Sequence, residues 1–335
     1  MYKKIKNIDI ATNSNEAASF ANGEYIALCD HDDILAPHAL YEMAKAINET
    51  KSEFLYSDEA LFKKNYKRVM VAHFKPNLDY SYLLSCNYIC HLACFKRDVF
   101  NQVGGFDPKC SGSQDHDLFL KILEKTKTAY HIDKVLYYWR VHAESTSGGT
   151  GAKPYVAAAA KRAIENHLER IGVKASVTDG KFPSTYKVCY EIGDEPLVSI
   201  IIPNKDHEED LQKCINSIYE KTIYKNFEII IAENNSTGTT IFYYYEELEK
   251  KHSNLKIVRY EGDFNYSKIN NFATSFAKGE YVLLLNNDVE IITPNWLSEM
   301  VAECIQPTVG AVGAMLYYDN DTVQHAGIIT GLGGY

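Results

Sequence analysis

Residues 23–33 read GEYIALCDHDD and join a short apolar run to an acidic turn. The apolar run, residues 25–29, has the length of a strand buried inside a sheet. Three carboxylates, Asp30, Asp32 and Asp33, follow it directly. Because ligands of open α/β sheets collect beyond the carboxyl ends of the strands, this stretch predicts an α/β fold with a polar site at the end of this strand.

The same stretch occurs twice in the chain. Residues 19–26, SFANGEYI, are echoed by SFAKGEYV at residues 275–282. In the second copy the acidic turn reads NNDV at residues 286–289, which leaves Asp288 as its one carboxylate. The two copies are separated by far more than the roughly 20–50 residues of solenoid repeats, so they predict a duplicated domain.

Each copy is expected to be incomplete, on opposite sides of the shared stretch. In the second copy the residues from Pro196 to Ala273 precede it, whereas residues 1–18 alone precede it in the first. Conversely, the first copy continues to Thr150 and the second stops at Tyr335. We therefore expect the back part of one domain, a linker and the front part of a second domain, at residues 1–171, 172–195 and 196–335.

Alternating strands and helices are predicted for the second half. Short apolar runs predict buried strands at residues 198–202, 227–232, 255–260 and 281–285. Helical patterns lie between them: one starting near Leu211, one over residues 243–251, and one capped by Ser267 that ends at Phe276. This order predicts a parallel, Rossmann-like sheet. The G-x-G-x-x-G fingerprint is absent, which disfavours dinucleotide dehydrogenases.

The first half is expected to contain a mixed sheet with flanking helices. The strand at residues 25–29 is followed by a helix over 37–48, which has a proline near its first turn. Short strands and helices continue to Arg140, and an Ala-rich helix is expected at residues 154–171. Two more short strands are expected inside the linker.

Composition excludes several classes of protein. The formal net charge of −9 leaves no basic surplus to neutralise phosphates, so we expect no nucleic-acid partner. No apolar run approaches the ~20 residues that span a bilayer. The basic start at residues 1–6 is followed by no apolar segment of a signal peptide. We expect a cytoplasmic protein, with peripheral association with the inner membrane left open.

The eight cysteines are mostly widely spaced and lie within apolar stretches. This usage is typical of reduced, buried thiols in a cytoplasmic protein. Cys86, Cys90 and Cys94 are spaced by four residues, and His91 lies among them. Their spacing matches no common zinc pattern, although a metal cluster stays open as an alternative to small core thiols.

The acidic turn of the first copy is a candidate metal site. Asp30, Asp32 and Asp33 repel one another unless a positive charge neutralises them, and oxygen ligands suit Mg²⁺ or Mn²⁺. The alternative is a solvated acidic turn. In the second half, Glu233 follows the second strand at the same edge of the predicted sheet.

Further motifs accompany the acidic turn along most of the chain. In the first copy they are GGFD at residues 104–107, GSQDHDL at 112–118, and YWRVH at 138–142 with Ser145. In the second copy they are residues 198–203, ENNS at 233–236, FNYS at 264–267 with Asn270 and Asn271, and VQHAG at 323–327. In this order they resemble the family-2 glycosyltransferases with the GT-A fold, of the tandem-domain type that builds bacterial surface polysaccharides.

The resemblance implies an inverting transfer of a sugar from a nucleoside-diphosphate sugar, of the UDP or dTDP type, to a saccharide or lipid-linked saccharide acceptor. It implies Asp115 as the general base and Mg²⁺ or Mn²⁺ as the cofactor. The implied metal ligands are Asp30, Asp32, His142 and Asp288. The implied nucleotide contacts are Pro203, Glu233, Asn235 and Asn270.

Alternative interpretations remain at this point. Asp115 could cap the helix that follows it, and Glu233 could simply stabilise a turn. The whole chain could be a catalytically incomplete remnant or scaffold that at most binds nucleotide. A nucleotidyltransferase is disfavoured, because residues 202–206, IPNKD, provide no Gly-rich phosphate loop. The two halves could assemble as one permuted domain, although both carry the same strand, which would make one copy redundant.

Overall fold

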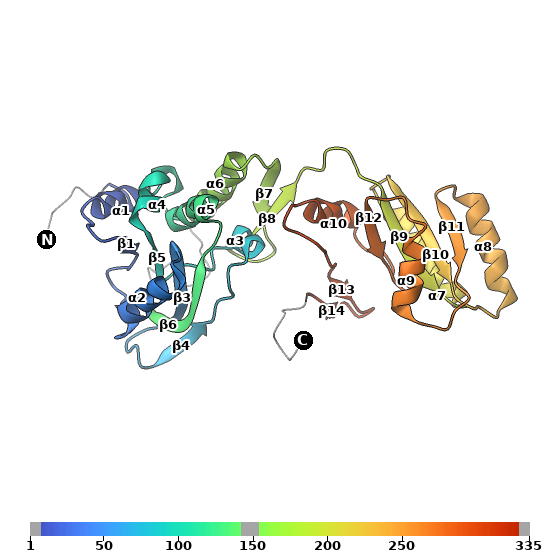
Figure 1. The fold of residues 1–335 in the computed structure, drawn as a ribbon, viewed down its shortest axis with the longest axis horizontal. Coiled ribbons are helices and arrows are strands. Elements are labelled where there is room, and N and C mark those ends of the chain that lie inside the picture. Colours follow the sequence, from blue (N-terminus) through green and yellow to red (C-terminus); the bar gives the residue numbers. More distant parts are fainter. Residues whose placement is uncertain (1–7, 142–153, 328–335) are drawn as a thin grey trace. The chain divides into compact units, whose positions relative to one another are not determined.

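The computed structural model describes residues 8–141 and 154–327. The chain divides into two compact units, Met1–Tyr190 and Glu191–Tyr335, each with its own sheet and core (Figure 1). Within the described ranges, no helix combines the length and the apolar character needed to cross a membrane.

A mixed six-stranded sheet, of order β1-β5-β3-β6-β2 with β4 added to β3, forms the centre of the first unit. Its strands are β1 (Tyr25–Ala27), β2 (Ile34–Leu35), β3 (Phe54–Phe62), β4 (Val69–His73), β5 (Ala93–Lys96) and β6 (Tyr130–Arg140). β3 runs parallel to β6, whereas β1 and β3 both pair antiparallel with β5. The strand of the repeated stretch, β1, therefore lies at an edge of the sheet.

Helices cover both faces of this sheet. Successive side chains of β3 point to opposite faces and so enter two different cores. Phe54 and Tyr56 enter a core shared with Phe119, whereas Leu55 enters a second core with Met43. The helices are α1 (Ile10–Ala18), α2 (Ala39–Thr50), α3 (Tyr80–Ser85), α4 (Arg97–Gln102), α5 (Gln114–Thr126) and α6 (Pro154–Arg170), with a 3₁₀ turn at Pro108–Cys110.

A hairpin completes the first unit. Its strands, β7 (Ala175–Asp179) and β8 (Tyr186–Tyr190), pair antiparallel. Val177 and Tyr186 are buried in the same core as α5 and α6. The structure therefore shortens the linker expected at residues 172–195, because the hairpin buries apolar side chains that a linker would leave in water.

The second unit contains the parallel sheet that the sequence predicts, in the order β11-β10-β9-β12. Its strands are β9 (Val198–Asn204), β10 (Phe227–Glu233), β11 (Leu255–Arg259) and β12 (Tyr281–Leu284). Ile200 and Ile202 face one core, and Ile201 between them faces the other. Burial on both sides explains why the sequences of the central strands β9 and β10 are continuously apolar.

Four helices flank the parallel sheet: α7 (Glu208–Lys221), α8 (Thr239–Lys251), α9 (Tyr266–Thr274) and α10 (Trp296–Cys304). A small hairpin, β13 (Leu316–Tyr317) with β14 (Val323–His325), follows them. The expectation that Ser267 caps α9 is wrong. Asn265 is the N-cap, and its side chain accepts a hydrogen bond from the Lys268 amide, so the helix begins two residues earlier than expected.

The repeated strand has a different neighbour in each unit. In the second unit β12 pairs parallel with β9, with Tyr281 opposite Val198. In the first unit β1 pairs antiparallel with β5, with Tyr25 opposite Lys96. Among the described residues, the repeated strand therefore has one neighbour in each unit, and the two neighbours run in opposite directions relative to it.

The glycine of the repeated G-E-Y sequence provides a test of this difference. A Cβ atom on Gly279 would lie 2.6 Å from the Ser199 nitrogen and 2.7 Å from the Leu197 oxygen, whereas on Gly23 the nearest atom is the Tyr25 oxygen at 3.1 Å. We expect Gly279→Ala to lower the free energy of unfolding by about 1–3 kcal/mol, because the added methyl group would force the backbone of Leu197 and Ser199 to move.

The matched control is Gly23→Ala, which we expect to cost clearly less. Urea unfolding of both variants, with hydrogen exchange measured on β9 peptides, checks the prediction. Equal losses in the two variants would contradict it.

Candidate active site

Strand β6 holds the acidic turn of the first unit in place. The Tyr137 hydroxyl donates to Asp33 Oδ2 at 2.5 Å and accepts from the Asp30 amide at 3.0 Å. The Arg140 amide donates to Asp33 Oδ1 at 2.7 Å, and the Arg140 Nε donates to the Asp32 carbonyl oxygen at 2.6 Å. The turn after β1 is thus fixed by a strand that follows it by about a hundred residues in sequence.

Asp30, Asp33 and His91 form a group that could hold a metal ion. Each offers one ligand atom, and these atoms all lie within 4.8 Å of one another. The His91 ring stacks on Tyr137, with ring centroids 4.9 Å apart, and meets Trp139 edge-on. Carboxylate oxygens with one imidazole nitrogen are a ligand set that suits small divalent cations.

The electrostatics of Asp30 are consistent with a site that a cation would stabilise. Partial desolvation by the surrounding protein raises the pKa of Asp30, although its side chain still reaches solvent. His91 opposes this shift, while the charges of Asp33 and Asp115 add to it. A cation bound here would favour the ionised carboxylate and lower this pKa.

The predicted metal ligands have different positions in the structure. Asp30 belongs to the group, but Asp32 does not; its side chain is 31% exposed and lies 3.9 Å from His31. His142 lies outside the described residues. Asp288 is exposed in the second unit, where the described residues contain no comparable group.

The residue that sequence reasoning missed is His91. Asp33 belonged to the acidic turn predicted as a metal site, although the resemblance named Asp30 and Asp32 as the ligands. His91 was noticed only through its cysteine neighbours, and the pairing of β5 with β1 is what brings the segment before β5 to the turn. No zinc cluster forms there, because Cys94 is buried in a core and the Cys90 thiol donates to the Asn87 carbonyl oxygen. Burial also raises the pKa of Cys90, as expected for an unreactive thiol.

Asp115, the predicted general base, lies in the first turn of α5, near enough to the acidic turn for its charge to act on Asp30. Its Oδ2 accepts a hydrogen bond from Asn87 Nδ2 at 2.9 Å. Ser113 is the N-cap residue of this helix, so Asp115 is not. Since the Asp115 charge raises the pKa of Asp30, the two carboxylates share one electrostatic environment.

In the second unit, Glu233 is buried and its carboxylate is engaged within the protein. Oε1 accepts from the Ser236 amide, and Oε2 accepts from the Ser236 and Tyr245 hydroxyls, all at 2.6 Å. Tyr245 also accepts from Asn204 Nδ2, and Asn204 Oδ1 accepts from Asn287. Glu233 therefore stabilises the turn after β10.

The other predicted nucleotide contacts also lie beside the carboxyl ends of these strands. Pro203 is half-buried near the end of β9. Asn235 is exposed, has φ of 57°, and donates to the Gly262 carbonyl oxygen at 3.0 Å. Asn270, on α9, is buried, and its Oδ1 has no hydrogen-bond partner. A buried acceptor without a partner is unusual in a folded protein, which makes Asn270 Oδ1 a candidate for a contact that the described residues do not supply.

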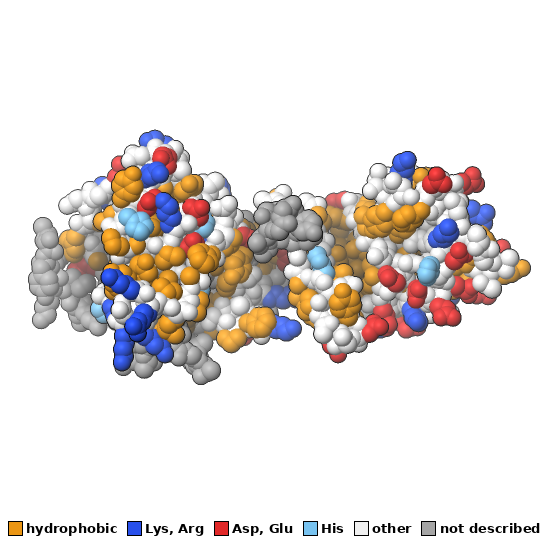
Figure 2. Space-filling view, turned by 90° about the horizontal axis from the view of Figure 1, so that it is seen from below, with side chains coloured by type: hydrophobic (Ala, Val, Ile, Leu, Met, Phe, Trp, Pro, Cys, Tyr) orange, Lys and Arg blue, Asp and Glu red, His pale blue; other side chains and the backbone are white. Residues whose placement is uncertain are grey.

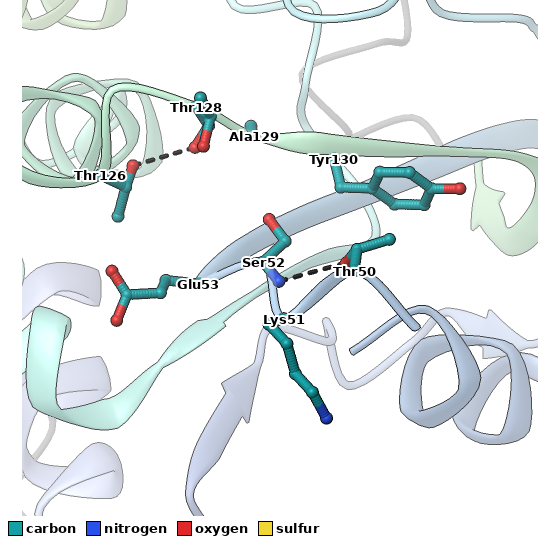
Figure 3. A pocket seen from close by; sticks show the side chains of 8 residues that line it. All are labelled: Thr50, Lys51, Ser52, Glu53, Thr126, Thr128, Ala129 and Tyr130. Atoms are coloured by element: carbon teal, nitrogen blue, oxygen red, sulfur yellow. Dashed lines mark hydrogen bonds between the residues drawn. The ribbon is translucent and has the colours of Figure 1, made fainter. Parts of the chain in front are cut away.

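A surface hollow lies at the opposite edge of the first sheet. It is lined by residues from the end of α2, the starts of β3 and β6, and the end of α5: Thr50, Lys51, Ser52, Glu53, Thr126, Thr128, Ala129 and Tyr130 (Figure 3). Because β3 and β6 run in the same direction as β1, their starts are remote from the acidic turn, so this hollow is separate from the candidate site.

Charged side chains are unevenly distributed over the two units. On the face drawn in Figure 2, acidic side chains gather on the second unit, while Lys and Arg cluster at the lower rim of the first.

The parallel β-α-β sheet of one unit, and the mixed sheet with its acidic turn in the other, match the architecture expected for the GT-A glycosyltransferases. Family comparison confirms this class. The model of glycosyl transferase family 2 matches residues 2–104 and 199–329, and the chain belongs to that family.

The relatives are longer proteins. An uncharacterized protein of Sinorhizobium fredii, y4gI, is 41% identical over 96% of this chain, which spans 36% of the relative. The O-antigen biosynthesis protein RfbC of Myxococcus xanthus is 36% identical over 98% of the chain, which spans 25% of it. Among solved structures, a mannosyltransferase from Pyrobaculum calidifontis, in complex with GDP-Man and Mn²⁺, is 23% identical to this chain, with a TM-score of 0.34. The match covers 38% of this chain and 37% of the mannosyltransferase.

The Tyr137 contacts can be tested by removing the hydroxyl. We expect Tyr137→Phe to lower the free energy of unfolding by about 1–3 kcal/mol, because Asp33 loses a donor and the Asp30 amide loses an acceptor. Chemical denaturation of the full chain measures this loss. Tyr130→Phe, at the exposed start of the same strand, is the control; an equal loss there would contradict the prediction.

Proposed function

We propose that this chain is part of an inverting, metal-assisted glycosyltransferase. It would transfer a sugar from a nucleoside-diphosphate sugar to a saccharide or lipid-linked saccharide acceptor, in polysaccharide or O-antigen-type biosynthesis. The observation that carries the proposal is the meeting of Asp30, Asp33 and His91 in a space that Asp115 also faces. Family membership and the name of the Myxococcus relative support the reaction class.

The donor set of the first unit fits Mg²⁺ or Mn²⁺. Asp30 and Asp33 supply carboxylate oxygens, and His91 supplies an imidazole nitrogen at compatible spacing. Such an ion supplies positive charge to a leaving diphosphate. Asp32 and His142 are further proposed ligands on the basis of the resemblance, as is Asp288 in the second unit.

Asp115 is the proposed general base. Its carboxylate takes the proton from the acceptor hydroxyl while the acceptor oxygen attacks the anomeric carbon of the donor sugar. The bond from this carbon to the diphosphate oxygen breaks in the same step, and the diphosphate leaves with its electron pair. One displacement inverts the anomeric configuration. Asn87 orients the base through its hydrogen bond to Oδ2.

The second unit is proposed to bind a nucleotide of the UDP or dTDP type. Pro203 is near the carboxyl end of β9 and Asn235 follows β10, at the edge of the parallel sheet where ligands of this architecture collect. Asn270 Oδ1 offers a free buried acceptor. Glu233 contributes by fixing the turn at residues 233–236 on which Asn235 lies.

A catalytically incomplete remnant is the second candidate function. The edge positions of β1 and β12 in the sheets of the described residues support this alternative. Calorimetry with UDP or dTDP in the presence of Mn²⁺ separates the two: metal-dependent nucleotide binding supports the enzyme, and absence of binding supports the remnant. We place the reaction in the cytoplasm, at the cytoplasmic face of the membrane where a lipid-linked acceptor would be presented.

Two carboxylate variants test the division of roles. We expect Asp30→Asn to weaken Mn²⁺ binding about tenfold or more, which corresponds to about 1.4 kcal/mol per factor of ten, because a charged ligand is lost. Asp115→Asn should leave Mn²⁺ affinity within about threefold and abolish sugar transfer. Mn²⁺ titration followed by electron paramagnetic resonance, and incorporation assays with radiolabelled UDP- and dTDP-sugars, measure the two effects.

The reverse pattern would refute the proposed roles: unchanged Mn²⁺ binding in Asp30→Asn, or sugar transfer retained in Asp115→Asn. Glu53→Gln in the remote surface hollow is the matched control, and it should change neither measurement.

A further inference from the structure

A buried ion pair lies directly behind His91. Glu59 is on β3, and Lys75 follows β4; their side chains are 2% and 3% exposed, with Nζ 3.1 Å from Oε2. Charges at this depth cost free energy unless they are paired and hydrogen-bonded. Apolar replacements of such pairs are often neutral or stabilising, so stability alone does not account for this one.

The ion pair holds the His91 backbone from both sides. The His91 amide donates to Glu59 Oε2 at 3.1 Å, and Lys75 Nζ donates to the His91 carbonyl oxygen. Lys75 Nζ also donates to the Ile89 carbonyl oxygen at 2.6 Å. The three donors of the ammonium group therefore match three acceptors: one carboxylate and two carbonyl groups.

The same network fixes the two charged residues themselves. The Lys75 amide donates to Asp58 Oδ1 at 2.9 Å, and this oxygen also lies 2.8 Å from His131 Nε2. Glu59 Oε1 lies 3.0 Å from His73 Nδ1. Interconnected, fully satisfied polar groups of this kind hold one arrangement rather than several.

On the other side, the His91 imidazole stacks on Tyr137 and faces Asp30 and Asp33. We propose that Lys75 and Glu59 are positioning residues, which fix His91 against Asp30 and Asp33 and thereby set the cation affinity of this group. The inference rests on the proposed function in one respect: both take Asp30, Asp33 and His91 to bind a cation. Neither residue touches the ion; each acts through the backbone of His91.

Mn²⁺ titration of the full chain tests the inference through a double-mutant cycle. We expect Lys75→Met and His91→Ala each to weaken Mn²⁺ binding about tenfold. The double variant should bind no more weakly than His91→Ala, because Lys75 acts only through that ring. Fully additive losses, or Mn²⁺ affinity within twofold of wild type in a folded Lys75→Met chain, would overturn the inference.

Lys121→Met is the matched control. Lys121 forms a similarly enclosed ion pair with Asp117, at 2.9 Å, and also donates to the Gly105 carbonyl oxygen. It should lose stability and retain its Mn²⁺ affinity. If Lys75→Met does not fold, Glu59→Gln replaces it, with an expected two- to fivefold weakening; no weakening in that variant would equally overturn the inference.

A metal-free measurement separates this inference from the proposed function. Imidazole signals of ¹³C-labelled histidine, with His91 assigned by its loss in His91→Ala, should shift or broaden in Lys75→Met but not in Lys121→Met. An unmoved His91 signal refutes the positioning role whether or not the chain binds Mn²⁺. A shifted signal in a chain that binds no Mn²⁺ refutes the proposed metal site and leaves the positioning of His91 established.

Discussion

The Tyr137 hydroxyl contacts both ends of the acidic turn, and it does so across 107 residues of sequence to Asp30 and 104 to Asp33. The candidate site depends on this contact. Burial and the Asp33 hydrogen bond raise the pKa of Tyr137, so the hydroxyl keeps its proton and remains a donor. The same ring stacks on His91, which precedes β5. The Tyr137 side chain therefore joins the acidic turn, the segment before β5 and the end of β6.

The sequence predicted the second unit far better than the first, for a physical reason. The central strands β9 and β10, which are buried on both faces, have continuously apolar sequences, and apolar runs also located the outer strands β11 and β12. The first unit depends on pairings between distant strands, such as β3 with β6, which leave no local pattern. His91 could not be placed in the site from spacing, since its approach to Asp30 needs the antiparallel pairing of β5 with β1. The predicted start of α9 was wrong because Asn265 and Ser267, two residues apart, are both residue types that cap helices.

The duplicated stretch shows how one sequence pattern serves in two settings. β12 packs beside β9, where a Cβ on its glycine, Gly279, would come within 2.6 Å of the Ser199 nitrogen, and where the Gly279 amide donates to Ser199 Oγ. The run of β1 packs beside β5, and Gly23 has no such close approach. The acidic turns also differ. Asp30 and Asp33 lie beside His91 in the first unit, whereas Asp288 is exposed in the second. Strand formation is therefore a local property of the repeat, while the chemistry of each turn comes from its surroundings.

The position of β12 has a consequence for the behaviour of the polypeptide in solution. Within the described part of the chain, β12 is an edge strand of its sheet. Its residues Val282 and Leu284 are 43% and 52% exposed. An unprotected rim of backbone donors and acceptors, flanked by apolar side chains, acts as a template for intermolecular β-pairing. Colloidal stability of this polypeptide is thus governed less by its net charge of −9 than by whether that rim is covered, and a single lysine introduced there would serve as a gatekeeper against self-association.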